Sequence, residues 1–262
     1  MNVRVSINLS RWLIVLKILP LTALFCLLKW ITHQMKWEIG SFDALTGSLL
    51  GAVTFTLAFL LTGTLNDYRM SKDMPDQLST SANSIQDTNL LIANRYPDYN
   101  PVPLAESLAE ILKSVVLWLE QGKPFERVEN TITILNEALV PLSKYAEPPL
   151  MTRIQAEQAN MRHIVARIRM IRDTDFLTPA YTLLDILLIA ASIALLTVGT
   201  KDFNANLLIS GFLFATFTYL VMLIHDLDNP FEFDGKSCAD VDLSHLRRTS
   251  KSLVQVGSQK YH

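Results

Sequence analysis

Two stretches of the sequence, Ala44 to Asn66 and Phe203 to Ile224, each run for more than 20 residues without a charged side chain. A helix of about 20 apolar residues spans the hydrocarbon core of a bilayer. Half of all residues are hydrophobic, and they gather toward the two ends of the chain, whereas the middle is polar. The sequence therefore predicts a membrane protein rather than a water-soluble one.

Two further segments, Trp12 to Leu28 and Phe176 to Thr200, are long enough to span a bilayer but contain charges. We expect Lys17 and Lys29 to extend toward opposite membrane interfaces. We expect Asp185 to pair with Lys17 or with a backbone donor. A cleaved signal peptide is the alternative for the N-terminus, but no small-residue cleavage pattern follows the first segment. The sequence thus predicts four transmembrane helices.

Lysine and arginine are concentrated in alternate connections, which predicts the orientation. Residues 67–175 hold 12 of them, the N-terminal tail two and the C-terminal tail five, whereas the two short loops hold three. The positive-inside rule then places both termini and the middle segment on the cytoplasmic side of a plasma or bacterial inner membrane. The expected domains are residues 1–66 (N-terminal tail and spans one and two), 67–175 (cytoplasmic helical domain), 176–224 (spans three and four) and 225–262 (cytoplasmic C-terminal tail).

The polar middle of the chain has helical periodicity, and its apolar residues form three faces. These faces are Leu104, Leu108, Ile111, Leu112, Val115 and Leu119; Val128, Ile132, Leu135, Leu139 and Leu142; and Ile154, Met161, Ile164, Ile168 and Ile171. Gly122 and Pro124 end the first helix, and Pro148-Pro149 end the second. We interpret the faces as the core of a helical bundle. The second span has no helix breaker before Pro75, so its helix is expected to continue into this bundle.

Composition and residue spacing argue against several functions. The net charge of −2 and the lack of a basic run interleaved with aromatic residues argue against nucleic acid as a partner. The five histidines and two cysteines lie far apart, so neither a zinc site nor a disulfide is predicted. No nucleophile with its base and no phosphate-binding loop is present, so we expect neither an enzyme nor a cofactor.

The densest polar cluster, residues 225–235, follows the fourth span. Its acidic residues lack the spacing and fixed glycine of an EF-hand loop, so a structural role at the helix end is favoured over a calcium site. We assign the helix end to Asp226, Asp228, Asn229, Pro230 and Phe231. Candidate cation contacts are Glu232, Asp234, Asp240 and Asp242.

The second span carries a stripe in which Gly47, Gly51, Phe55 and Phe59 recur at every fourth residue, with Thr62 following. The glycines permit close helix packing. In an oligomer with a central pore, the same stripe would line the pore and form a hydrophobic constriction. Spacing alone favours packing.

Several of these motifs resemble bestrophin channels. Leu220 to Asp234, with its HDLDNPFEFD core, resembles the acidic stretch and Asn-Pro-Phe that close the last bestrophin span. Ala239 to Leu246 is similar to the Asn-Asp-Leu-Pro-Leu segment of bacterial bestrophins, and Phe59 to Arg69 is similar to the end of the second bestrophin helix. The Asp-Leu-Asp-Asn-Pro-Phe motif most resembles the bestrophin-like DUF4239 group.

The resemblance implies a homopentamer around one axis, with second helices lining a transmembrane neck above a cytoplasmic vestibule. The neck face would be Gly47, Gly51, Phe55 and Phe59, whose two glycines depart from the aromatic-rich neck of animal bestrophins. The animal calcium clasp is interrupted here by Phe233 and by Gly235 to Ala239.

We therefore expect a bestrophin-like channel that conducts small ions passively, with the lipid bilayer and further copies of itself as partners. The alternative is a non-conducting membrane receptor or scaffold whose cytoplasmic bundle binds a partner. A transporter is the third hypothesis, and it depends on Asp185, an ionisable residue within a span.

Overall fold

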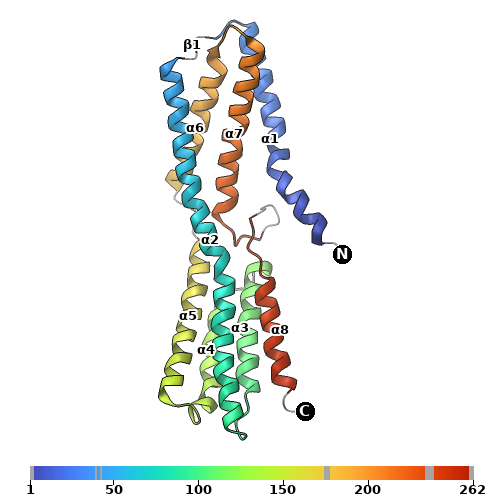
Figure 1. Ribbon diagram of the computed structural model, residues 1–262, viewed down its shortest axis with the longest axis vertical. Coiled ribbons are helices and arrows are strands. Elements are labelled where there is room, and N and C mark those ends of the chain that lie inside the picture. Colours follow the sequence, from blue (N-terminus) through green and yellow to red (C-terminus); the bar gives the residue numbers. More distant parts are fainter. Residues whose placement is uncertain (1–2, 39, 42, 174–177, 234–238, 260–262) are drawn as a thin grey trace. The chain divides into compact units, whose positions relative to one another are not determined.

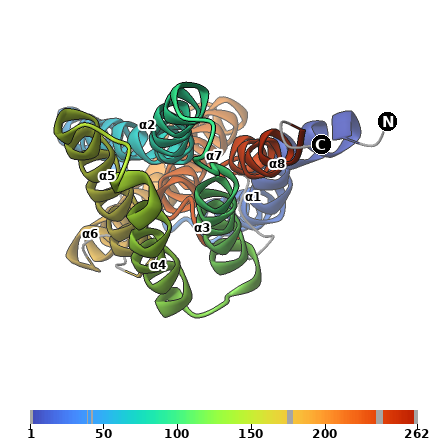
Figure 2. The same ribbon diagram turned by 90° about the horizontal axis from the view of Figure 1, so that it is seen from below.

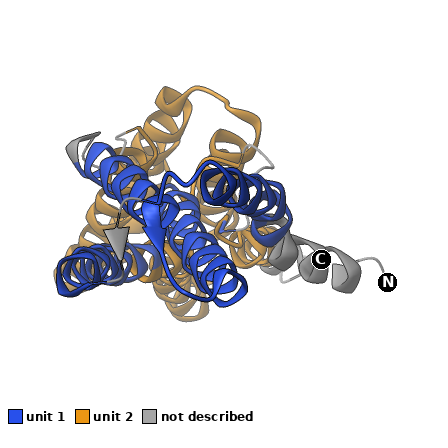
Figure 3. Cartoon of the chain, turned by 90° about the horizontal axis from the view of Figure 1, so that it is seen from above, with its two compact units in different colours: residues 1–68, 175–229, 236–239 blue, residues 69–174, 230–235, 240–262 orange. Residues whose placement is uncertain are grey.

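The computed structural model describes residues 3–38, 40–41, 43–173, 178–233 and 239–259. The chain divides into two compact units (Figure 3), unit 1 with residues 1–68, 175–229 and 236–239, and unit 2 with residues 69–174, 230–235 and 240–262. Helix α2 (Ala44–Arg95) is 52 residues long and contributes to both units. The expected continuation of the second span is confirmed, and Pro75 lies inside the helix.

Unit 1 contains four helices that are long and apolar enough to cross a membrane: α1 (Val3–Gln34), the first part of α2, α6 (Thr178–Thr197) and α7 (Phe203–Asp228). The prediction of an all-helical membrane protein with four transmembrane helices is confirmed. Helix α7 lies between α1 and α6 and packs against both (Figure 1). At one end, the two-residue strands β1 (Gly40–Ser41) and β2 (Val198–Gly199) pair in parallel.

The interior of unit 1 is small, and many large apolar side chains lie outside it. Phe25 of α1 stacks on Phe214 of α7 with 4.3 Å between ring centroids. Leu208 and Phe212 of α7, by contrast, are 74% and 70% exposed. Lipid tails solvate such side chains without cost, so this pattern is typical of membrane-spanning helices.

Unit 2 is a helical bundle built from the second part of α2, α3 (Val102–Gln121), α4 (Phe125–Ser143), α5 (Pro148–Asp173) and α8 (Ser244–Gln259). Helix α4 packs against α3 and α5, and α8 packs along α3 (Figure 2). Every apolar position predicted for the first two faces is buried, and Ile171 of the third face is partly buried. The prediction of a bundle core is confirmed.

The structure corrects some helix boundaries. Pro148 and Pro149 begin α5 rather than ending α4, because proline fits the first turn of a helix, where its missing N–H has no intrahelical partner. The first span continues to Gln34, well beyond Leu28. The third span ends at Thr197, because the next two residues form β2.

Candidate functional site

The glycine and phenylalanine stripe lies on a face of α2 that the described part of its own chain leaves largely uncovered. Phe55 and Phe59 are 74% and 70% exposed. A Cβ atom added to Gly47 or Gly51 would have no described atom within 4 Å apart from its chain neighbours and the backbone of its own part of the helix. The helix instead uses a different face for its own unit, where Leu50, Val53 and Leu57 are buried. Packing within one chain is therefore the wrong interpretation of the stripe.

The hydroxyl groups along this exposed part of α2 are already bonded. Thr62 is exposed, and its hydroxyl donates to the carbonyl of Ala58 at 2.8 Å. Thr56 donates to Ala52 in the same way at 2.9 Å. Because both protons bond to the helix itself, the stripe presents an apolar surface.

The end of α7 is held to the start of α6 by a tyrosine. The hydroxyl of Tyr181 donates to a carboxylate oxygen of Asp228, and the tyrosine ring lies 4.4 Å from that of His225. Asp226 and Asn229 are partly buried. Nothing in the sequence pointed to Tyr181, because the pairing depends on how α6 and α7 pack.

Residues 230–235 and 240–262 belong to unit 2. Phe231 is fully buried in its core, Glu232 is exposed, and the carbonyl of Pro230 accepts the N–H of Val241 at 3.0 Å. Asp234 lies outside the described residues. This segment is thus attached to unit 2 through backbone bonding and apolar burial.

Asp242 lies just before α8 and satisfies part of its first turn. Its two carboxylate oxygens accept the hydroxyl and the N–H of Ser244, each at 2.8 Å. These two bonds lower the pKa of the Asp242 carboxyl below its ordinary value. Asp240 is partly buried two residues earlier. In the part of the chain that the structure describes, no group of three or more histidine, cysteine, aspartate or glutamate residues is arranged to hold a metal.

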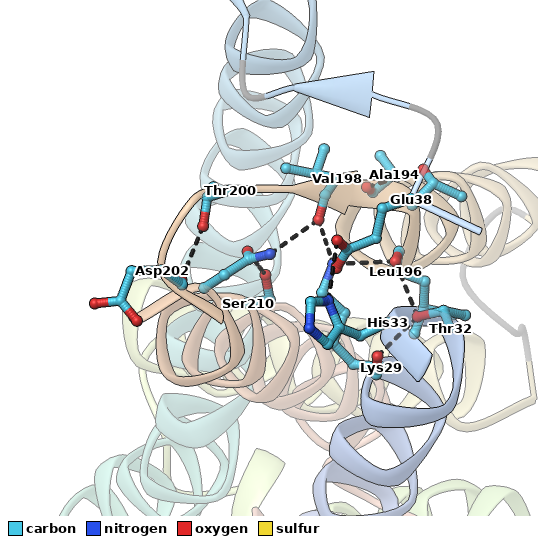
Figure 4. Close-up of polar contacts among 12 residues, drawn as sticks. Lys29, Thr32, His33, Glu38, Ala194, Leu196, Val198, Thr200, Asp202 and Ser210 are labelled. Atoms are coloured by element: carbon cyan, nitrogen blue, oxygen red, sulfur yellow. Dashed lines mark hydrogen bonds and ion pairs between the residues drawn. The ribbon is translucent and has the colours of Figure 1, made fainter. Parts of the chain in front are cut away.

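The structure also contains a buried lysine whose role the sequence did not predict (Figure 4). Lys29 is 0% exposed, and its ammonium donates to the carbonyl of Leu196 at 3.0 Å and to the carbonyl of Val198. The last carbonyls of a helix have no intrahelical partners and carry a partial negative charge. Lys29 therefore caps the end of α6, which is also the end of the third span; the extension of Lys29 toward a membrane interface stays a prediction.

A carboxylate and a histidine complete this Lys29 cluster. Glu38 lies 3.8 Å from the Lys29 ammonium and 3.1 Å from Nδ1 of His33. The ring of His33 stacks on Phe203, with 4.0 Å between centroids. A Cβ at Gly199 would lie 2.8 Å from a carboxylate oxygen of Glu38, so any larger residue would require the Glu38 side chain to shift. The cluster joins the ends of α1 and α6 to the start of α7.

Asn206 of α7 connects to the same carbonyl. Its amide donates to the carbonyl of Val198 at 3.0 Å, and its own oxygen accepts the hydroxyl of Ser210 at 3.1 Å (Figure 4). The carbonyl of Val198 thus accepts from two side chains, and α6 and α7 are bonded at this level.

The pairing expected for Asp185 is not found among the described residues. Lys17 and Asp185 are both exposed, and neither makes an ion pair or hydrogen bond with a residue that the structure describes. The expected pairing of Asp185 with Lys17 or with a backbone donor is therefore absent from the described part of a single chain.

Comparison with solved structures identifies the fold of this chain. No family model matches the sequence, and no curated protein matches it. A mutant of a bacterial bestrophin homologue from Klebsiella pneumoniae, with one tryptophan replaced by alanine, matches with a TM-score of 0.77 at 13% identity, over 95% of this chain and 98% of that one. The structure of the same homologue solved by Zn-SAD phasing matches with a TM-score of 0.77 at 12% identity, over 94% and 99%.

A third crystal structure, described as that of a membrane protein, matches with a TM-score of 0.77 at 11% identity, over 94% of this chain and 99% of that one. The molecule is thus an all-helical membrane protein with a bestrophin-like fold, as the sequence motifs implied. Its likeness to the DUF4239 group stays a prediction.

Proposed function

We propose that this protein is an ion channel in which α2 helices from several copies, five by the bestrophin resemblance, surround a central pore. The observation that carries the proposal is the exposure of Phe55 and Phe59 on a face of α2 that its own unit leaves uncovered. The bestrophin-like fold of the whole chain supports a ring in which that face meets the axis.

The composition of the stripe suggests how the pore is gated. Successive members are four residues apart, so they lie nearly above one another on the helix. Gly47 and Gly51 would leave one half of the pore wide, whereas Phe55 and Phe59 would narrow the other half. A narrow apolar ring loses water readily, and ion flow is then limited by the size and apolarity of the ring.

The first experiment compares two phenylalanines with similar exposure. Phe55→Ala in liposomes containing the purified protein is expected to increase passive flux of small ions, because it widens the apolar ring. Phe212→Ala is the control, since Phe212 is 70% exposed on α7 and lies outside the stripe. The flux of each of several small anions and cations across the liposome membrane is measured, together with the mass of the oligomer.

Two outcomes would contradict the proposal. Unchanged flux in Phe55→Ala together with a weakened oligomer would show that the stripe is a contact between copies and does not line a pore. A stable ring without any flux, in the wild type and in Phe55→Ala, would favour the receptor or scaffold hypothesis.

We also propose that both termini and the helical domain at residues 67–175 lie in the cytoplasm, as the distribution of lysine and arginine indicates. Cysteines introduced one at a time at Ser41 and Asn204 should react with an impermeant reagent on intact cells. Cysteines at Gln121 and Ser250 should react only after the cells are opened. Reaction at Gln121 in intact cells would reverse the orientation.

A further inference from the structure

Lys17 on α1 and Asp185 on α6 are opposite charges that lie within membrane-spanning segments and are exposed. A charge facing hydrocarbon is costly, and charged residues in spans generally pair with another group. Neither residue pairs with any described residue of its own chain. The buried Lys29, by contrast, has its partners within the chain. Lys17 and Asp185 are therefore left without a partner among the described residues of one chain.

The two charges lie at the same depth. The bond between Lys29 and the carbonyl of Leu196 places these two residues at about the same level, next to the end of α6 at Thr197 and five residues before the end of α1 at Gln34. Lys17 precedes Lys29 by 12 residues, and Asp185 precedes Leu196 by 11. At about 1.5 Å per residue, both charges lie roughly 17 to 18 Å below that level.

The two charges do not meet in one chain, because α7 lies between α1 and α6 (Figure 1). Each charge is continued along its helix by exposed apolar side chains at intervals of three or four residues. On α1 these are Leu21, Leu24 and Leu28, and on α6 they are Ile189 and Ile193. The two helices run in the same direction, so the flanks match in depth along their length.

We propose that Lys17 of one copy pairs with Asp185 of the neighbouring copy, with the apolar flank of α1 packed against that of α6. This inference rests on the oligomeric channel proposed above and specifies one contact in it. A contact between two different surfaces, repeated from copy to copy, forms a ring when the rotation between copies closes. A lipid phosphate would neutralise Lys17 but would leave Asp185 without a partner, whereas a second copy satisfies both charges.

Disulfide crosslinking between two kinds of chain tests the contact directly. Both chains carry Cys26→Ala and Cys238→Ala; one adds Lys17→Cys, and the other, with a larger tag, adds Asp185→Cys. Oxidation of membranes containing both chains should give a mixed band, which is a disulfide-linked dimer of one chain of each size. Only a bond between two copies produces this dimer. The matched control places the second cysteine at Ile193, on the exposed side of the same helix but about 12 Å further along. That pair should give no mixed band.

Charge exchange provides a second measurement. Lys17→Glu or Asp185→Lys alone places like charges together and should cause loss of oligomer in native mass spectrometry. The double variant restores an opposite pair and should restore the oligomer. Absence of the mixed band, with oligomer and flux retained in every variant, would overturn the pairing while the channel proposal stands. A wild-type monomer would overturn both. Loss of bound anionic lipid in Lys17→Gln, with an unchanged oligomer, would assign Lys17 to a headgroup instead.

Discussion

Unit 2 buries its large apolar side chains, whereas unit 1 leaves many of its own exposed. In unit 2, Leu108 and Leu112 of α3 are 0% exposed, whereas Glu106, Lys113 and Glu120 of the same helix are exposed. In unit 1, Leu208 of α7 and Phe55 of α2 are each 74% exposed. In water, an apolar residue indicates the inner face of a helix. In a bilayer it does not, because lipid accepts the apolar side chain as readily as a neighbouring helix does.

Charged residues show the opposite contrast. The ion pair of Arg95 and Glu147 in unit 2 is exposed, with both side chains more than 60% accessible. Lys29 in unit 1 is fully buried and bonds to backbone carbonyls that no intrahelical N–H reaches. Exposed pairs contribute little, whereas the loss of one partner from a buried arrangement leaves groups without bonds. Charged side chains that bond to a partner therefore contribute different amounts to stability in the two units.

Lys29→Ala is expected to have the largest effect on stability. It leaves the carbonyls of Leu196 and Val198 and the carboxylate of Glu38 without the ammonium, at a cost of about 3–5 kcal/mol. Arg95→Ala removes an exposed partner and should cost less than about 1 kcal/mol. Unfolding of the purified protein in mixed micelles compares the two. Equal losses in the free energy of unfolding would show that the buried and the exposed charge contribute alike to stability.

Two leucine truncations sharpen the apolar comparison. Leu112→Ala leaves a cavity in the core of unit 2 and should destabilise it by about 2–5 kcal/mol. Leu208→Ala leaves none, so its effect should stay within about 0.5 kcal/mol. Thermal unfolding measures both. A large loss in Leu208→Ala would show that this side chain is buried by something other than lipid, such as a second copy.

Asp242→Asn is expected to give the smallest change. The carboxylate is exposed and holds the first turn of α8, so its loss should cost about 0.5–1 kcal/mol. Because folding lowers the pKa of Asp242, its contribution is fully present above the ordinary aspartate pKa and is lost as the pH falls through the lowered value. Unfolding measured across that acid range should show the wild type approaching Asp242→Asn. A constant difference would rule out the carboxylate as the source.

Much of the fold followed from local rules. Uncharged stretches identified the spans, and periodicity identified the faces of α3, α4 and α5, because each depends only on residues within one helix. Gly122 ends α3 with a φ of +62°, a conformation that glycine adopts without strain. The bond between Tyr181 and Asp228 was not predictable in this way, since it joins residues from two helices that are far apart in sequence.

Lys17 and Lys29 lie on one helix, and the sequence by itself determined that both fall within or beside the first span. Only the tertiary structure decided that Lys29 is buried and Lys17 exposed. The difference comes from the position of α6. Its last carbonyls lie within hydrogen-bonding distance of Lys29, whereas Asp185 lies on the other side of α7 from Lys17. A charge within a membrane is placed by the partner that neutralises it, and that partner comes from another part of the fold.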